Sequence, residues 1–166
     1  LAKLEQILAK TKTEEKLKAL TIELFFPTFK RLGWEKINGE IHTDTLLRSL
    51  LLSRLGRSGD KKVVEKAKYL FKEMLKGVHL DPDIRYVIYN IVARYGGEKE
   101  YKILIERYKK EPLHEEKNRI GNALGAFKDQ KILYLVSEFA LSPNVRIQDT
   151  VSIISSIGMN PMGRNL

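Results

Sequence analysis

Residues 80–97 read Leu-Asp-Pro-Asp-Ile-Arg-Tyr-Val-Ile-Tyr-Asn-Ile-Val-Ala-Arg-Tyr-Gly-Gly, and this stretch decides the fold class. Its apolar residues recur at the three- and four-residue spacing of a single helix face; they are Ile84, Val87, Ile88, Ile91, Val92 and Tyr95. Asp81 precedes a proline at the first helical position, where the missing N–H costs nothing. Two glycines then end the pattern. The stretch therefore predicts an amphipathic helix between a cap and a chain reversal.

The same pattern recurs along the chain in pairs of helices. We expect pairs at 43–59 with 60–76, at 80–97 with 98–109, and at 112–127 with 129–141, followed by another first helix at 142–158. The arginines that open successive first helices are spaced by 37, 34 and 27 residues; they are Arg48, Arg85, Arg119 and Arg146. Such irregular spacing is typical of a degenerate HEAT-like stack, not of a strict array.

The chain as a whole is predicted to be all-α, since no segment shows the two-residue alternation of an amphipathic strand. We expect a HEAT-like solenoid of helix pairs, an α-α superhelix with about eight main helices, in one domain over residues 1–166. Residues 1–13 should be a lead-in helix or a linker, and Pro27 should kink or split its helix. The last repeat offers a new helix start at Asn160 and stops at Leu166. We therefore expect a truncated repeat from a larger protein, with self-association through this end.

Charge and composition exclude several classes of partner. The net charge is +9, and residues 1–76 carry 17 Lys and Arg against 10 Asp and Glu. A groove that follows nucleic acid needs concentrated charge, but acidic residues are interleaved throughout and no basic stripe carries stacking aromatics. No run approaches the roughly 18 apolar residues that cross a bilayer. We expect no nucleic-acid and no membrane partner. Because the chain lacks cysteine, it has no disulfide, and a cytoplasmic location is favoured.

Catalytic motifs are incomplete. The three histidines, His42, His79 and His114, are 37 and 35 residues apart and form no local metal site. His114 begins a string like the zinc-peptidase H-E-x-x-H, but position 118 is Asn, so the second imidazole is missing. The sequence also lacks a phosphate-binding loop and a nucleophile elbow. We expect no catalytic residue, no metal ligand and no cofactor in this chain.

Several strings, in this order and spacing, are similar to those of one family. They are Leu32-Gly-Trp-Glu35, Thr45-Leu-Leu-Arg-Ser-Leu50, Asp81-Pro-Asp-Ile-Arg-Tyr-Val-Ile-Tyr-Asn90, Glu115-Glu-Lys-Asn-Arg119, Ala123-Leu-Gly-Ala-Phe127, Val145-Arg-Ile-Gln-Asp149 and Asn160-Pro-Met-Gly-Arg164. In this arrangement the chain resembles the C-terminal helical domain of zinc aminopeptidases of the aminopeptidase N superfamily, in the puromycin-sensitive, oxytocinase and tricorn-interacting-factor branch. The resemblance runs from about residue 17 to the end.

The resemblance implies a non-catalytic domain of a zinc metallo-aminopeptidase, a hydrolase that removes N-terminal residues from peptides. It implies that this domain closes the substrate chamber and contacts longer peptides. Zn²⁺ and its ligands would then belong to the N-terminal catalytic domains of the parent chain, which are the expected partners together with peptide substrates.

The candidate peptide-binding residues are Gln148, Arg146, Arg119 and Arg85. The resemblance carries the family's cavity-facing segment onto Arg146 and Gln148, and an amide can both donate to and accept from a peptide backbone. If the first helices face inward, the recurring arginines lie near the rim of the concave surface. Two alternatives stay open: Gln148 caps or bridges helices, and each arginine pairs with an acidic neighbour in the adjacent repeat. For the whole chain, the alternatives are a free-standing HEAT-like interaction scaffold and a HEAT-like DNA-binding protein.

Overall fold

Helices account for the fold of the chain. The computed structural model describes residues 2–164 and residue 166, and it contains no strand among them. The helices of this part are α1 Ala2–Leu8, α2 Glu14–Leu32, α3 His42–Ser58, α4 Lys61–Leu75, α5 Pro82–Arg94, α6 Glu98–Lys110, α7 His114–Leu124, α8 Gln130–Ala140 and α9 Ile147–Gly158. The all-α prediction is confirmed, with one short helix before eight longer ones. Within the described residues, no helix has the length and apolar character needed to cross a membrane.

The starts of α4, α5 and α8 carry the capping residues that the sequence predicts. Asp60 accepts a hydrogen bond from the backbone N–H of Val63 at 2.9 Å, and Asp129 accepts one from Lys131 at 2.8 Å. Asp81 accepts one from the N–H of Asp83 at 2.9 Å. Each carboxylate thereby satisfies an N–H that the first helical turn leaves unpaired. At the other end of α3, Gly59 has a φ of 85°, which lies in the left-handed region that glycine adopts without strain.

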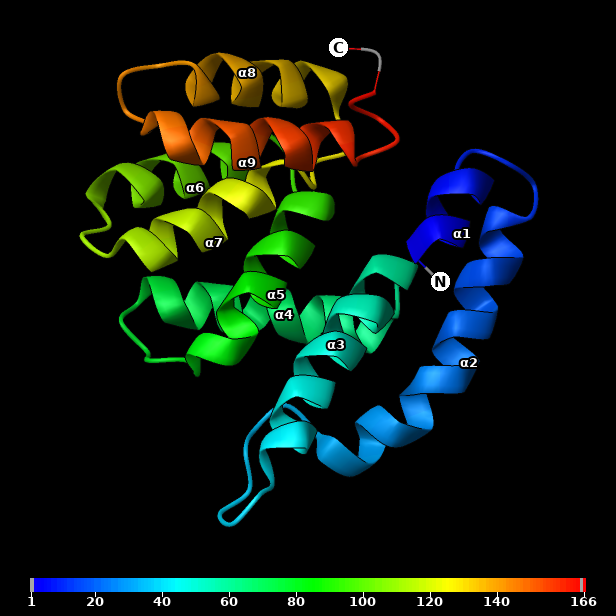
Figure 1. The fold of residues 1–166 in the computed structure, drawn as a ribbon. Coiled ribbons are helices and arrows are strands. Elements are labelled where there is room, and N and C mark those ends of the chain that lie inside the picture. The colour runs from blue at the N-terminus through cyan, green and yellow to red at the C-terminus, as the bar shows by residue number, and fades with distance from the viewer. Residues whose placement is uncertain (1, 165) are drawn as a thin grey trace. The chain divides into compact units, whose positions relative to one another are not determined.

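The described residues group into two compact units, which divide within α5 between Ile91 and Val92. In the first unit α2 packs against α1 and α3, and α3 also contacts α4. The ribbon of α2 continues through Pro27 and bends in that half of the helix (Figure 1). The core of this unit is aliphatic and aromatic; it includes Leu51, Leu52, Leu55, Val63, Ala67, Phe71, Ile84, Val87 and Ile88. A single domain over residues 1–166 stays a prediction.

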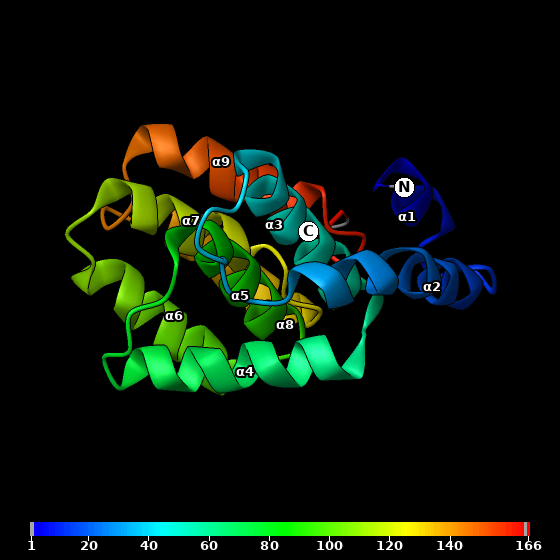
Figure 2. The same ribbon diagram turned by 90° about the horizontal axis from the view of Figure 1, so that it is seen from below.

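In the second unit α6 to α9 alternate in direction, so that α7 and α9 run the same way (Figures 1 and 2). α7 contacts α6 and α9, and α8 contacts α9. The large buried side chains of this unit include Leu104, Tyr108, Ile120, Leu124, Phe127, Leu133, Val136 and Ile153. Because α7 and α9 are parallel neighbours, their N-terminal turns lie at the same edge of the unit.

The residues after α9 correct one prediction. Asn160 does not start a helix within the described residues; the chain turns at 159–164. Its side-chain amide is buried and donates to the carbonyl oxygens of Gly125 and Phe127 at 2.8 and 2.7 Å, while its Oδ1 accepts from the N–H of Met162. The sequence also predicts that a missing helix leaves Ile153, Ile154 or Ile157 exposed; Ile153 and Ile157 are buried, whereas Ile154 is 39% exposed. Asn160 acts as a polar bridge that ties the end of α9 to the turn after α7.

Candidate peptide-binding site

Three of the four predicted peptide-binding residues lie on neighbouring helices of the second unit. Arg119 is on α7, and Arg146 and Gln148 are at the start of α9. Arg85 lies on α5 in the first unit, so its surroundings are described separately. The candidate site in this unit therefore comprises the middle of α7, with Arg119, and the start of α9, with Arg146 and Gln148.

Arg146 is held by a carboxylate of its own helix. It is the residue that precedes α9, and its Nε and Nη2 donate to the two oxygens of Asp149 at 2.6 and 3.0 Å. Asp149 is 7% exposed, and this two-bond geometry is the strong form of an arginine–carboxylate pair. The hydrogen bond to Asp149 raises the pKa of the Arg146 guanidinium, against the opposing effect of burial. Arg146 is therefore charged but already paired.

Tyr108, from the end of α6, lies close enough to this ion pair for both of its charges to act on the phenol. Its ring is buried and meets Phe139 edge to face, with 5.2 Å between the ring centroids. The ammonium of Lys117 lies 5.4 Å from the same ring, within the range of a cation–π contact. Burial raises the pKa of the Tyr108 hydroxyl; the Asp149 carboxylate raises it further and Arg146 opposes this. The phenol is thus neutral at physiological pH.

Arg119 is also occupied by carboxylates of its own helix. Its Nη1 donates to Glu116 at 2.9 Å, and its Nη2 donates to Glu115. The side chain of Glu116 is 3% exposed, whereas that of Glu115 is 78% exposed. The alternative in which each arginine pairs with the adjacent repeat is wrong for Arg119 and Arg146, because both pair within three or four residues of their own position.

Gln148 differs from these arginines. It lies in the first turn of α9, it is exposed, and no hydrogen bond to its side chain occurs within the described part of the chain. No hydrogen bond of that kind supports the alternative in which the Gln148 amide caps or bridges helices. A peptide amide that reaches the start of α9 can therefore exchange hydrogen bonds with Gln148 without displacing a protein partner.

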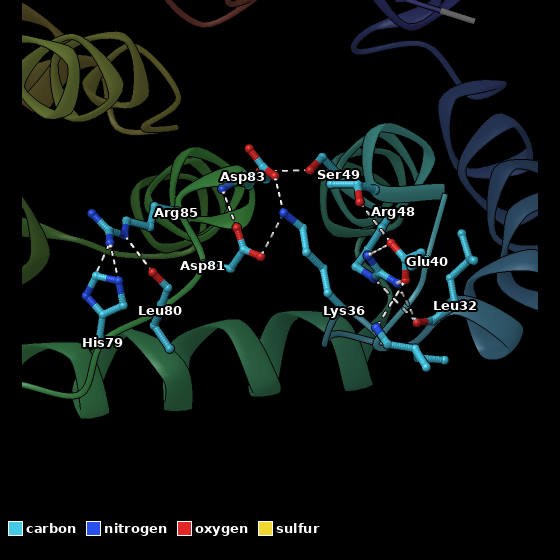
Figure 3. Close-up of polar contacts among 12 residues, drawn as sticks. Leu32, Lys36, Glu40, Arg48, Ser49, His79, Leu80, Asp81, Asp83 and Arg85 are labelled. Atoms are coloured by element: carbon cyan, nitrogen blue, oxygen red, sulfur yellow. Dashed lines mark hydrogen bonds and ion pairs between the residues drawn. The ribbon is translucent and has the colours of Figure 1, made fainter. Parts of the chain in front are cut away.

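Arg85 stabilises the turn before its own helix. Its Nε donates to the carbonyl of Leu80 at 2.9 Å, and its Nη2 lies 3.3 and 3.5 Å from the ring nitrogens of His79 (Figure 3). These contacts close the 79–85 segment on itself at the start of α5. Arg85 is part-buried in this role.

Arg48, the remaining recurring arginine, is buried and does not lie at the rim of a concave surface. It is 1% exposed, and it donates to the Leu32 carbonyl at 3.1 Å and to both carboxylate oxygens of Glu40 (Figure 3). These bonds hold the 33–41 loop, which joins α2 to α3. The hydrogen bond from Arg48 lowers the pKa of Glu40 to about 2; Thr45 and the Ile37 amide add to this effect, and burial opposes it.

A second contact ties the same loop to α5. Lys36 Nζ lies 2.6 Å from a carboxylate oxygen of Asp83 and 3.2 Å from one of Asp81 (Figure 3). The Ser49 hydroxyl donates to the Asp83 carbonyl at 2.8 Å, which links α3 to the same point. The hydrogen bond to Asp83, followed by that to Asp81, raises the pKa of Lys36. Residues 33–85 of the first unit therefore carry a structural network of ion pairs and hydrogen bonds.

Sequence reasoning missed the partners that occupy the arginines, although spacing alone contained a signal for two of them. Asp149 follows Arg146 by three residues, and Glu115 and Glu116 precede Arg119 by four and three. Such pairs face each other on one side of a helix. Tyr108 and Glu40 carried no such local signal, because they come from other elements. Among the described residues, no three His, Asp or Glu side chains gather where they could hold a metal ion.

Comparison with known proteins places the chain in a family. The model of the ERAP1-like C-terminal domain matches residues 1–166. The chain belongs to the ERAP1-like C-terminal domain family. It is 32% identical to Aminopeptidase M1-A of Oryza sativa over 149 residues, which is 86% of this chain and 17% of that protein. It is 29% identical to the Puromycin-sensitive aminopeptidase of Caenorhabditis elegans over 154 residues, 92% of this chain and 16% of that protein.

A third relative is the Glutamyl aminopeptidase of Mus musculus, 29% identical over 153 residues, which is 87% of this chain and 16% of that protein. The chain thus spans about a sixth of the length of the relatives that it matches. The resemblance to the C-terminal helical domain of aminopeptidases, drawn from the order of short strings, is confirmed.

Proposed function

We propose that this chain is the non-catalytic C-terminal domain of a zinc-dependent aminopeptidase, where it closes the substrate chamber and contacts longer peptides. The observation that carries the proposal is the match of the whole chain to the ERAP1-like C-terminal domain, together with aminopeptidase relatives of which it covers about a sixth. Chemistry at Zn²⁺ would belong to the N-terminal catalytic domains of the parent chain, and the proposed setting is cytoplasmic. The family match also favours this function over a free-standing scaffold or a DNA-binding protein.

Within this function we assign the direct peptide contact to Gln148. A peptide backbone is neutral and presents both N–H and C=O groups, so an exposed amide at the start of α9 suits it. Arg146 and Arg119 are proposed as secondary contacts, because a peptide carboxylate would have to compete with Asp149 or with Glu115 and Glu116. Arg85 is also proposed as a secondary contact, because a peptide carboxylate would have to compete with His79 for its guanidinium.

The test is Gln148→Ala in the intact parent enzyme, with kcat/KM measured for a long peptide and for a single-residue reporter. Losing one neutral hydrogen bond is worth about 0.5–1.5 kcal/mol, so we expect roughly a two- to twelvefold loss on the long peptide. The reporter, which does not reach α9 in this proposal, should be hydrolysed as before. Gln6→Ala on α1 is the matched control, since it removes an amide for which the described residues provide no hydrogen bond.

Equal losses on the two substrates, with a lower Tm, would assign Gln148 to helix packing and remove the peptide contact from the proposal. The wider proposal has its own test. Dialysis of the parent against a chelator should abolish hydrolysis of both substrates, and Zn²⁺ should restore it. Hydrolysis that survives metal removal would contradict a zinc-dependent parent.

A further inference from the structure

The tip of the 33–41 loop holds an Asn-Gly pair in a tight turn. The N–H of Glu40 donates to the carbonyl of Ile37 at 3.0 Å, which closes a four-residue turn around Asn38 and Gly39. Gly39 has a φ of 81°, the conformation that the third residue of a type II turn requires and that glycine adopts without strain. Both Asn38 and Gly39 are exposed. The loop therefore presents an asparagine amide to water directly before a glycine.

The surroundings of this pair leave its reactive groups accessible. Within the part of the chain that the structure describes, no hydrogen bond engages the Asn38 side chain or the Gly39 N–H. A methyl group placed at Gly39 would meet nothing within 4 Å, so the space beside this residue is open. Any other residue type would place a side chain next to the backbone nitrogen. Here that nitrogen can approach the amide carbon of Asn38 without obstruction.

None of the other described asparagines precedes a glycine; they are Asn90, Asn118, Asn122, Asn144 and Asn160. Asn144 is exposed as Asn38 is, but the branched side chain of Val145 stands beside the nitrogen that would have to react. Asn160 is buried, its amide donates to two carbonyl oxygens, and the proline that follows it has no N–H. Position 38 thus combines an exposed amide with an unhindered neighbouring nitrogen.

We propose that Asn38 is a site of spontaneous deamidation in the folded chain, since asparagine is a thermolabile residue. The Gly39 nitrogen, as it loses its proton, forms a bond to the Asn38 amide carbon; the bond from that carbon to Nδ2 breaks, and ammonia leaves. Water then opens the five-membered imide at one of its two carbonyl carbons. Opening at the side-chain carbonyl gives aspartate, and opening at the main-chain carbonyl gives isoaspartate. The reaction consumes one water, releases one ammonia and needs no oxidant or reductant.

The isoaspartate form should disturb the buried ion pair that holds the loop, because it inserts one CH₂ into the backbone between Ile37 and Glu40. The Glu40 carboxylate accepts from the N–H of Ile37 at 3.3 Å and from the Thr45 hydroxyl at 2.9 Å. It also forms the ion pair with Arg48 (Figure 3). A longer turn moves Glu40 relative to these donors and leaves the buried guanidinium of Arg48 without its carboxylate. The aspartate form keeps the backbone length and should leave the pair intact.

Peptide mapping by mass spectrometry tests the site. After incubation of the chain at mildly alkaline pH, we expect deamidation at position 38 at least about tenfold faster than at Asn144. An isoaspartyl methyltransferase, which methylates the isoaspartate carboxylate, should label the incubated chain at this position. Asn38→Gln is the matched control: its longer side chain would have to form a six-membered ring, so it should stay unlabelled. No product at position 38, or equal rates at Asn38 and Asn144, would overturn the proposal. The same mapping of the intact parent should find the product at position 38, and its absence there would also overturn it.

Thermal unfolding tests the effect on the loop. The isoaspartate form, separated by ion exchange, should have a Tm at least about 3 °C below that of the unchanged chain. Asn38→Asp carries the same added charge without the longer backbone, so it should keep the Tm of the unchanged chain. Prolonged treatment with the methyltransferase and its methyl donor, which returns isoaspartate to aspartate through the same imide, should restore the Tm. An isoaspartate form with an unchanged Tm would overturn the link between deamidation and the Arg48–Glu40 pair.

Discussion

At the scale of single residues, the buried ion pair of Arg48 and Glu40 determines how the 33–41 loop is held. The guanidinium satisfies the Leu32 carbonyl at the end of α2 and the carboxylate of Glu40 just before α3. Removing one member of such a pair leaves the other charge buried without compensation, which costs far more than the intact pair contributes. The loop should therefore stay closed as long as both groups are ionised.

This pair gives a prediction for pH dependence. Because Arg48 lowers the pKa of Glu40 from 4.5 to about 2, the unfolded chain binds a proton here at a higher pH than the folded chain. The stabilisation is fully present above about pH 4.5 and is lost as the pH falls toward 2. Urea unfolding followed by the fluorescence of Trp34, the sole tryptophan, should show this loss. Glu40→Gln should have a lower free energy of unfolding at neutral pH, and this free energy should change less with pH between 4.5 and 2.

The matched control is Glu138→Gln, an exposed residue of α8. Its pH profile should follow that of the unchanged chain. If Glu40→Gln has the same slope between pH 4.5 and 2 as the unchanged chain, then Glu40 is not ionised against Arg48.

From the sequence we could single out the recurring arginines, but we could not predict their partners or their burial. The repeat pattern located Arg48 near the start of a first helix, and we expected it near a rim. Its burial depends on Glu40, which lies in a loop without periodicity, and on a backbone carbonyl of the preceding helix. Burial of a charged side chain follows from such tertiary partners, so spacing within one helix does not reveal it.

At the scale of helices, the contact between α7 and α9 depends on Gly125. Its φ of −68° suits any residue, so the reason for glycine here is space and not backbone conformation. A methyl group would press against Ser156, both its hydroxyl and its backbone. Gly125→Ala should therefore push the two helices apart and destabilise the chain by about 1–3 kcal/mol. Gly158→Ala, at the same position of α9, should be neutral or stabilise by roughly 0.5–1 kcal/mol.

Thermal unfolding of the two variants, followed by circular dichroism, compares the positions directly. A loss in Gly158→Ala as large as that in Gly125→Ala would mean that the close contact with Ser156 does not explain the effect at Gly125. The comparison uses one chemical change at two equivalent sites, so the difference reports the space available around each glycine.

Helix-scale structure was the part most accessible from the sequence. The caps at Asp60, Asp81 and Asp129 and the stops at Gly59 and Gly96 were predictable, because they depend on residues within one turn. The end of the chain was not, because Asn160 resembles a helix cap locally. Its amide is drawn instead to the carbonyls of Gly125 and Phe127, more than thirty residues away. Long-range hydrogen bonds of this kind override the local signal.

At the scale of the whole molecule, the family was recognisable because seven short strings occur in the order and spacing of that family. The match of the family model to residues 1–166 agrees with this. The division into two compact units was not predicted. A helix that belongs to both units, as α5 does, has an uninterrupted apolar pattern from Ile84 to Val92, so its periodicity contains no mark of the boundary.

The last prediction concerns chemistry in the isolated chain. Aminopeptidase hydrolysis at zinc requires a metal-polarised carbonyl, an activated water and a general base. In α7 the H-E-x-x-H pattern fails at Asn118, and the described residues offer no cluster of three His, Asp or Glu side chains for a metal. The purified chain should therefore show no hydrolysis of aminoacyl reporters and less than one zinc per chain after dialysis, measured by atomic absorption. The intact parent, assayed alongside, is the positive control. One zinc per chain, with hydrolysis that a chelator abolishes, would contradict a non-catalytic domain and reassign the active site to this chain.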